Sequence, residues 1–254
     1  MVVLPHGVFD ADGTALITFG ATEPKATSAP PASAPAPRDE SHLAPEALQR
    51  RQRSIAQLRA EGVPVLETLP VIETEAEAKV RPIEEIVERA IALSFVAVRG
   101  EGLELDRTLE LVDEWSAQLT PAEEAFLALE HPTDHQRVQF VWRYEALGVL
   151  FWALELDFEL GRPDHIVDAG EVIGLLRSMG PSAFRSWSRR RAVGELLDAA
   201  DLIYRYHWAV VDARLRFEPP PADLDRGVVY ERHYALNWLL GYLDQSWDDV
   251  STDT

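Results

Sequence analysis

Trp142–Glu155, with the sequence WRYEALGVLFWALE, predicts a helix that has no fully polar side. Its apolar positions fall on two different faces when they are spaced at about 3.6 residues per turn. One face holds Trp142, Glu145, Val149 and Trp152, and another holds Arg143, Leu147, Leu150 and Leu154. A helix of this kind buries most of its surface, so we expect it at the centre of a helical protein.

The rest of the chain after residue 45 also has the spacing, length and boundary residues of helices. Thr120, Pro121 and Glu123 match a capping box, in which a threonine and a glutamate bind the free N–H groups at a helix start. The predicted helical stretches are Pro45–Gly62, Arg81–Gly100, Thr120–Leu129, Gln136–Glu155, Ala169–Met179, Arg189–Phe217 and Arg226–Leu243. The predicted fold class is therefore all-α: a single multi-helix globular domain with a short N-terminal hairpin or disordered appendage.

The N-terminal part of the chain differs in composition from the helical part. Residues 1–22 contain β-branched runs on either side of Asp10–Gly13, whose acids and glycine suit a tight turn, so we expect a β-hairpin there. Residues 23–45 are dominated by proline, alanine and serine, which bury too little apolar surface to form a core, and we expect a linker. Residues 46–254 are expected to form the helical domain.

Charged residues inside the central helix require partners. Arg143 and Glu145 are expected to be at least partly buried, and a buried charge persists only when it is paired and hydrogen bonded. The last two long helices offer groups of both signs within otherwise aromatic stretches. These groups are Arg205, His207, Asp212, Arg232, His233 and Asn237. We expect one buried polar network, in which Glu145 pairs with an arginine or histidine of these two helices.

Size and charge narrow the classes of function. The 254 residues are 46% hydrophobic, enough for a full core in one domain. A net charge of -19 repels nucleic acid and anionic membranes, so we expect neither as a partner. The longest apolar runs, Ala90–Val98 and Ala146–Leu154, are much shorter than the roughly 20 residues that span a bilayer. The chain has no cysteine and no signal-like N-terminus, so we expect a cytoplasmic protein.

Five long phrases of the chain occur in a fixed order between Arg50 and Thr254. They are RSIAQLRAEGVPVLETLP, IEEIVERAIAL, WRYEALGVLFWAL, DLIYRYHWAVVDARL and ERHYALNWLLGYLDQSWDDVSTDT. Together they resemble a bacterial family known as domain of unknown function 4272, and several phrases in register are more specific than one short motif. The resemblance implies a fold and no activity, and it supplies no catalytic residue. Residues 1–45 lie outside it.

A run of three arginines, Arg189, Arg190 and Arg191, is placed by the sequence in the first turn of a helix, where the helix dipole disfavours positive charge. Something acidic should offset them. We expect the aspartate-rich tail to fold back on the run, and the alternative is a bound anion or an acidic partner. The tail contains Asp244, Asp248, Asp249 and Asp253.

No stretch predicts a metal site or a cofactor. His131 and His135 have a spacing that zinc can use, but Pro132 places them in a loop and no further ligand accompanies them. Three alternating acids would lie on one side of an extended segment, where they could bind a hard cation, but a solvated edge is the favoured interpretation. These acids are Glu73, Glu75 and Glu77. The aspartate tail lacks the second acidic motif that magnesium-diphosphate sites use, so we expect no metal there either.

Two functions of different classes remain. The first is a non-enzymatic interaction or regulatory protein whose acidic surface binds a basic protein partner, and it is favoured because no catalytic motif is present. The second is an enzyme or a small-ligand-binding protein with a polar pocket between the helices. That pocket would be lined by Glu145, Arg205, His207, Arg232 and His233. In the second case Glu145 would act as a base or ligand, His233 would titrate near neutral pH, and an arginine would hold an anion.

Overall fold

The computed structural model describes residues 2–4, 7–9, 15–18, 40 and 43–254. Contacts between Cα atoms divide the chain into two units, Met1–His42 and Leu43–Thr254. Each unit is described by itself. Most of the expected linker over residues 23–45 lies outside the described residues, and so does the expected turn at Asp10–Gly13.

The first unit contains a small antiparallel sheet in the order β1-β2-β3. Its strands are β1 (Val2–Leu4), β2 (Gly7–Phe9) and β3 (Ala15–Thr18). Val8 lies opposite Val3 on one side and Ile17 on the other, and an irregularity follows between Val8 and Phe9. The pairing of β2 with β3 brings together the two β-branched runs that flank the expected turn.

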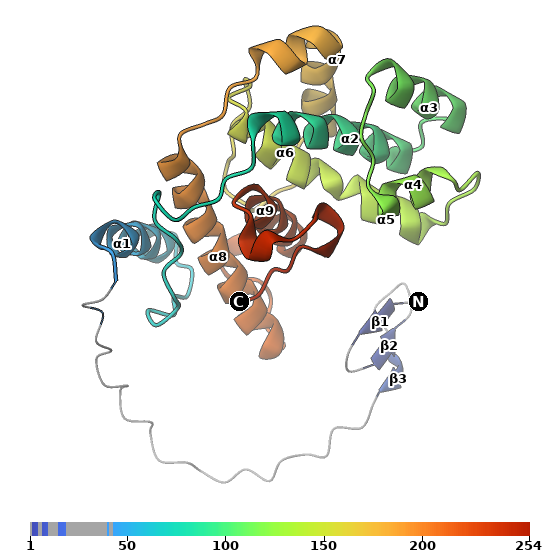
Figure 1. Ribbon diagram of the computed structural model, residues 1–254. Helices are drawn as coiled ribbons and strands as arrows, with labels where there is room; N and C mark the ends of the chain where they lie inside the picture. The colour runs from blue at the N-terminus through green and yellow to red at the C-terminus, as the bar shows by residue number, and fades with distance from the viewer. Residues whose placement is uncertain (1, 5–6, 10–14, 19–39, 41–42) are drawn as a thin grey trace. The chain divides into compact units, whose positions relative to one another are not determined.

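The second unit is built from α-helices, with three short 3-10 turns (Figure 1). The helices are α1 (Pro45–Ala60), α2 (Ile83–Glu101), α3 (Leu105–Glu114), α4 (Pro121–Leu127), α5 (Asp134–Val141), α6 (Arg143–Ala153), α7 (Ala169–Trp187), α8 (Val193–Leu215) and α9 (Arg226–Leu239). The 3-10 turns are η1 (Pro221–Asp223), η2 (Tyr242–Asp244) and η3 (Trp247–Asp249). The predicted all-α fold class is confirmed. None of the helices that the structure describes is long and apolar enough to cross a membrane.

Helix α6 lies at the centre of this unit, as its sequence predicts. It packs against α2 on one side and α9 on another, and it also contacts α5 and α7 (Figure 1). Leu147, Leu150 and Phe151 are completely buried. Complete burial of a large apolar side chain stabilises a fold by about 1.5–3 kcal/mol relative to leaving it in water, so α6 organises the core.

The helix boundaries follow local chemistry. At α4 the predicted capping box is present: the Thr120 side chain accepts from the Glu123 N–H, and the Glu123 carboxylate accepts from the Thr120 N–H. Helix α2 runs one residue past the predicted end at Gly100, and Gly102 ends it in a left-handed conformation with φ 118°. Glycine adopts this conformation without steric cost, so it ends helices well.

The single helix predicted over Gln136–Glu155 is two helices, α5 and α6, and this prediction is wrong in detail. Trp142 lies between them and keeps helical dihedral angles. The break arises because the N–H of Glu145 bonds to the carbonyl of Trp142, three residues earlier, in place of the residue four earlier. A bond of this 3-10 type tightens the turn and interrupts the regular ladder.

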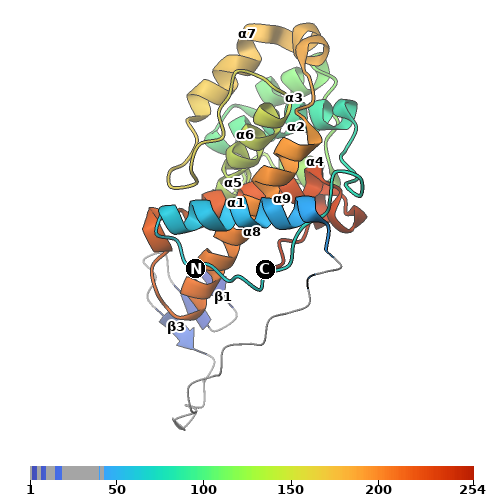
Figure 2. The ribbon, with the colours of Figure 1, turned by 90° about the vertical axis from the view of Figure 1, so that its left-hand side faces the viewer.

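Helices α1, α8 and α9 pack in succession, with α8 between the other two. Helix α1 lies across α8, and α8 packs against α9 (Figure 2). The N-cap of α9 is Asp225, whose side chain accepts from the N–H groups of Gly227 and Val228. Because α9 also packs on α6, its residues can pair in two directions: toward α6 and toward α8.

Gly227 lies directly against the Trp142 ring. A methyl group at this position would overlap three carbon atoms of that ring. We therefore expect Gly227→Ala to lower the free energy of unfolding by about 1–3 kcal/mol, the usual cost of overpacking a core. Chemical denaturation measures this difference. Gly174→Ala is the control, because its methyl group meets open space in helix α7, and it should instead stabilise the protein by about 0.5–1 kcal/mol.

Candidate functional site

Glu145 forms a buried ion pair between α6 and α9. Its carboxylate accepts from Nε of Arg232 at 3.2 Å and from the main-chain N–H of Val167. Arg232 also donates through Nη1 to the carbonyl of Gly161. Glu145 is 3% exposed and Arg232 6%. Burial lowers the pKa of Arg232, although Glu145 acts in the opposite direction. Arg232 is thus the partner in the last two long helices that the sequence predicts for Glu145.

A second ion pair, Arg143–Glu231, lies next to the first between the same two helices. Nη1 of Arg143 donates to Glu231 at 2.9 Å, and the guanidinium lies over the rings of Tyr234 and Trp247, at 4.8 Å and 5.9 Å from their centroids. Burial raises the pKa of Glu231 to about 7, although Arg143 opposes the shift. Aromatic faces stabilise a cation at these distances.

Two histidines meet between α8 and α9. Nδ1 of His207 and Nδ1 of His233 are 2.7 Å apart, and the two rings are nearly perpendicular. His207 is 7% exposed and His233 is 3% exposed. Burial lowers the pKa of His207 to about 4, with a smaller effect from Arg214, and burial together with His207 lowers the pKa of His233 to about 3. Both imidazoles are therefore neutral at pH 7 and share one hydrogen bond.

The histidine pair separates two pockets. His233 lines a pocket of about 310 Å³, which we call the His233 pocket, together with Tyr204 and Asn237. His207 lines a different pocket of about 300 Å³, the His207 pocket, together with Tyr230. Glu145, Arg205 and Arg232 line neither pocket. The five residues proposed for a single polar pocket are thus divided between these two pockets and closed ion pairs.

Arg205 belongs to a different part of the molecule. Its guanidinium makes two bonds to Asp201, at 2.9 Å and 2.8 Å, and one to the carbonyl of Pro70. Asp201 is completely buried. The prediction of one polar network is wrong, because residues two positions apart on a helix, such as Arg205 and His207, point about 200° apart. His207 faces α9, whereas Arg205 faces the segment before α2.

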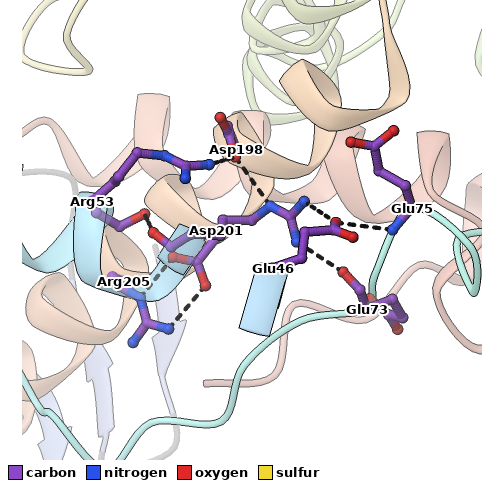
Figure 3. A network of polar contacts seen from close by, with 9 residues as sticks. Glu46, Arg53, Glu73, Glu75, Asp198, Asp201 and Arg205 are labelled. Atoms are coloured by element: carbon purple, nitrogen blue, oxygen red, sulfur yellow. Dashed lines mark hydrogen bonds and ion pairs between the residues drawn. The ribbon is translucent and has the colours of Figure 1, made fainter. Parts of the chain in front are cut away.

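Figure 3 shows the charged network around Asp201 and Arg205, in which α1, α8 and the segment before α2 meet. Arg50 is buried at its centre and bonds to Glu46 at 2.6 Å, to Asp198 at 3.0 Å and to the main-chain carbonyl of Glu73 at 3.0 Å. Arg53 adds a second bond to Asp198 at 2.6 Å. Arg50 therefore ties together three segments that are distant in sequence.

Two other residues of the predicted polar network have different surroundings. Asp212 forms an ion pair at 3.0 Å with Arg216, the residue directly after α8, and it lines neither histidine pocket. Its predicted place in the buried polar network is wrong, because it lies on a more exposed face near the end of the helix. Asn237 does line the His233 pocket, and its side-chain amide donates to the carbonyl of Ser251 at 2.8 Å. It thus fastens the last residues of the chain to α9.

The arginine run lies outside the helix in which the sequence placed it, since α8 begins only at Val193. The main-chain N–H groups of Arg189 and Arg191 donate to the carbonyls of Leu154 and Ala153, and Nε of Arg191 donates to the carbonyl of Trp152. The run thus closes the C-terminal end of α6, where the helix dipole favours positive charge. No additional acid is required.

The aspartate tail packs elsewhere, so the prediction that it covers the arginine run is wrong. The Asp248 carboxylate accepts from the N–H of Ala122 in the first turn of α4, at 3.1 Å. Trp247 beside it is buried, and its carbonyl accepts from the Tyr234 hydroxyl. The tail is therefore part of the core packing. Asp248 lies at the N-terminus of α4, where negative charge is favourable.

The possible metal ligands are dispersed. His131 is exposed beside Glu130, and His135 lies on the exposed side of α5. Glu77 binds Thr74, while a carboxylate oxygen of Glu75 lies against Gly194 in the first turn of α8. Within the part of the chain that the structure describes, no group of three or more histidine, aspartate or glutamate side chains is arranged to hold a metal ion.

The sequence interpretation missed helix α3 and the charge around it. Residues 101–134 contain ten acidic residues and one arginine, Arg107. Every acidic residue from 101 to 114 is exposed, and these are Glu101, Glu104, Asp106, Glu110, Asp113 and Glu114. Arg107 pairs with Glu110 at 2.8 Å. We call the exposed acids of residues 101–134 the acidic face. The density of acids in this one segment was the signal available in the sequence.

A hollow of about 600 Å³ opens within the acidic face. Three carboxylates line it: Glu104, Asp106 and Glu130. Two arginines border it as well, but their guanidinium groups are bound to main-chain carbonyls. Arg99 donates to Leu103, Leu129 and Glu130, and Arg137 donates to Gly100 and Glu101. The hollow therefore offers carboxylates that face solvent.

A family model described as "Domain of unknown function (DUF4272)" matches residues 50–250. The match includes every helix from α2 to α9 and most of α1. No curated protein and no solved structure matches the chain.

Proposed function

The chain belongs to the family of domains of unknown function DUF4272, and from this premise we propose that it is a non-enzymatic interaction protein whose acidic face binds a basic protein partner. The observation that carries the proposal is the excess of ten acids over one arginine in residues 101–134. This segment holds about half of the net charge of -19, and such a local excess of acids attracts a basic partner.

The hollow in the acidic face supplies a specific contact. A lysine or arginine side chain of the partner would enter it and meet Glu104, Asp106 and Glu130. Charge-assisted hydrogen bonds of this kind are roughly twice as strong as neutral ones. Nucleic acid and anionic membranes are disfavoured by the same charge. With no cysteine in its 254 residues, the protein is suited to a reducing compartment, and we place the contact in the cytoplasm.

The closed ion pairs argue against the alternative of an enzyme at the predicted polar cluster. A catalytic carboxylate must reach its substrate, whereas Glu145 is bound on both oxygens and lines neither histidine pocket.

Charge removal from the acidic face tests the proposal. The face variant Glu104→Gln/Asp106→Asn/Asp113→Asn removes three exposed charges, and we expect it to weaken binding of the basic partner about tenfold at low salt. The partner is first captured with the wild-type protein from a bacterial lysate and identified by mass spectrometry. It is then purified, and its affinity is measured by calorimetry at two salt concentrations.

The control variant removes three exposed charges elsewhere, on the segment after α6. It is Glu155→Gln/Asp157→Asn/Glu159→Gln. We expect this variant to bind like the wild type. The proposal is wrong if both triple variants lose the same affinity, if the face variant binds normally, or if the captured partner is acidic.

A further inference from the structure

The histidine pair connects the two pockets that it separates. An imidazole has two ring nitrogens, and Nδ1 of each ring is used in the bond between His207 and His233. The nitrogen left for the His233 pocket is therefore Nε2 of His233, and the nitrogen left for the His207 pocket is Nε2 of His207. Tyr204 packs against the first ring and Tyr230 against the second, which keeps both rings in place.

The two Nε2 atoms must have opposite hydrogen-bonding character. A neutral imidazole carries one proton, and in a bond between two Nδ1 atoms one ring donates and the other accepts. The ring that donates through Nδ1 has a bare Nε2, which accepts. The ring that accepts at Nδ1 carries its proton on Nε2, which donates. When the His233 pocket is offered an acceptor, the His207 pocket is offered a donor, and the reverse arrangement is the only other neutral state.

The His233 pocket has the chemistry of a site for a small organic cation. Two acidic residues, Glu73 and Asp253, line it, together with Tyr204 and Tyr242. Burial raises the pKa of Tyr242, and the charges of Asp253 and Glu73 raise it further, so both carboxylates act at this ring. Carboxylates and aromatic faces together favour an ammonium group. The nearby Arg205 is held by its two bonds to Asp201.

The His207 pocket has the opposite charge. Arg214 and Arg226 line it beside His207, and Arg214 is close enough to lower the pKa of that imidazole. The one carboxylate in the lining, Glu231, is paired with Arg143. Two guanidinium groups and an imidazole N–H favour a small oxyanion.

We propose that the His233 pocket binds a small primary alkylammonium ion, and that the histidine pair transmits this binding to the His207 pocket, where a small oxyanion then binds more tightly. An ammonium N–H donates to Nε2 of His233 and so selects the state in which that atom is bare. In the same state Nε2 of His207 carries the proton and donates to the oxyanion. Both ligands favour one tautomeric state, and each therefore raises the affinity of the other.

Nuclear magnetic resonance on isotope-labelled histidine nitrogens at about pH 7 measures directly which nitrogen of each ring carries the proton. The probes are n-butylammonium and inorganic phosphate. We expect n-butylammonium alone to move the proton of His233 onto Nδ1 and that of His207 onto Nε2. We also expect each probe to bind about fivefold more tightly when the other is present, a typical size for such coupling. Binding of either probe without a change of tautomer overturns the proposal, and so does failure of n-butylammonium to bind.

Two variants separate the relay from attraction between the two charged ligands across space. His207→Leu removes the relay, so n-butylammonium should still bind but the mutual enhancement should disappear. Gln139→Ala, at an exposed position of the His207 pocket, is the control and should keep the mutual enhancement. Enhancement that survives in His207→Leu would show that the histidine pair transmits nothing. If His207→Leu does not fold, the tautomer measurement on the wild-type protein still decides, and Glu73→Gln should weaken n-butylammonium about tenfold.

Discussion

Glu145→Ala is expected to lower the free energy of unfolding by about 3–5 kcal/mol. The change leaves Arg232 buried and charged without its carboxylate, and it also removes the acceptor of the Val167 N–H. A buried cation cannot regain its hydration unless the structure opens, so the cost far exceeds that of an exposed pair. Urea denaturation at pH 7 measures the difference in stability.

Two comparisons separate the effect of an unpaired Arg232 from the effect of lost side-chain volume. Glu124→Ala, at an exposed position of α4, should change stability by no more than about 0.5 kcal/mol. Glu145→Leu/Arg232→Met replaces the pair by apolar groups of similar size and should recover most of the stability lost in Glu145→Ala. A loss below about 1 kcal/mol for Glu145→Ala would mean that water reaches Arg232.

Acid is expected to destabilise the protein through the histidine pair. An unfolded histidine takes up a proton near pH 6.5, whereas in the folded protein burial lowers the pKa of His207 to about 4 and that of His233 to about 3. Below pH 6.5 the unfolded chain therefore binds more protons, and stability falls with falling pH until the folded pair also titrates. Each imidazole lowers the free energy of unfolding by on the order of 2 kcal/mol as the pH falls from 6.5 to 5.

Glu231 acts in the opposite direction and partly offsets this fall in the wild-type protein. Burial raises its pKa from 4.5 to about 7, so its contribution to stability decreases as pH rises through that interval. In His207→Gln/His233→Gln, two amides can hydrogen bond to each other but cannot titrate. We expect the double variant to lose the acid-dependent fall in stability, measured by denaturation at pH 5, 6 and 7, and the exposed control His135→Gln to retain it. If stability falls with pH as steeply in the double variant as in the wild type, groups other than the two histidines cause the fall.

The sequence predicts the helices well because their signals are local. The capping box at Thr120 and the apolar faces of Trp142–Glu155 need only neighbouring residues to be recognised. Helix α3 escaped this reasoning because Thr108 is its only buried residue, so a short apolar stripe among acids gives little periodic signal. The net charge therefore predicts an acidic surface but does not place it on residues 101–134.

Pairing in the candidate site could be predicted only in part. Burial of Glu145 in the central helix requires a cation, and the cation had to come from a helix that packs on it. Which faces of α8 and α9 meet depends on the rotation of each helix about its axis, and the sequence does not determine this rotation. The sequence thus predicts His207 and His233 as partners in the core, but it does not predict their bond to each other or the pockets on either side.

The closure of α6 by the Arg189–Arg191 segment has a consequence for the order of folding. Arg191 reaches the carbonyl of Trp152 from 39 positions later in the chain. The carbonyls in the last turn of α6 are therefore bound only after the chain between Trp152 and Arg191, which includes α7, has closed into a loop. Closing that loop costs entropy. During synthesis the end of α6 leaves the ribosome before the Arg189–Arg191 segment does. Its apolar side chains therefore stay uncovered until that segment has been made. We expect its last amide hydrogens to gain protection from exchange later than those in the middle of the helix.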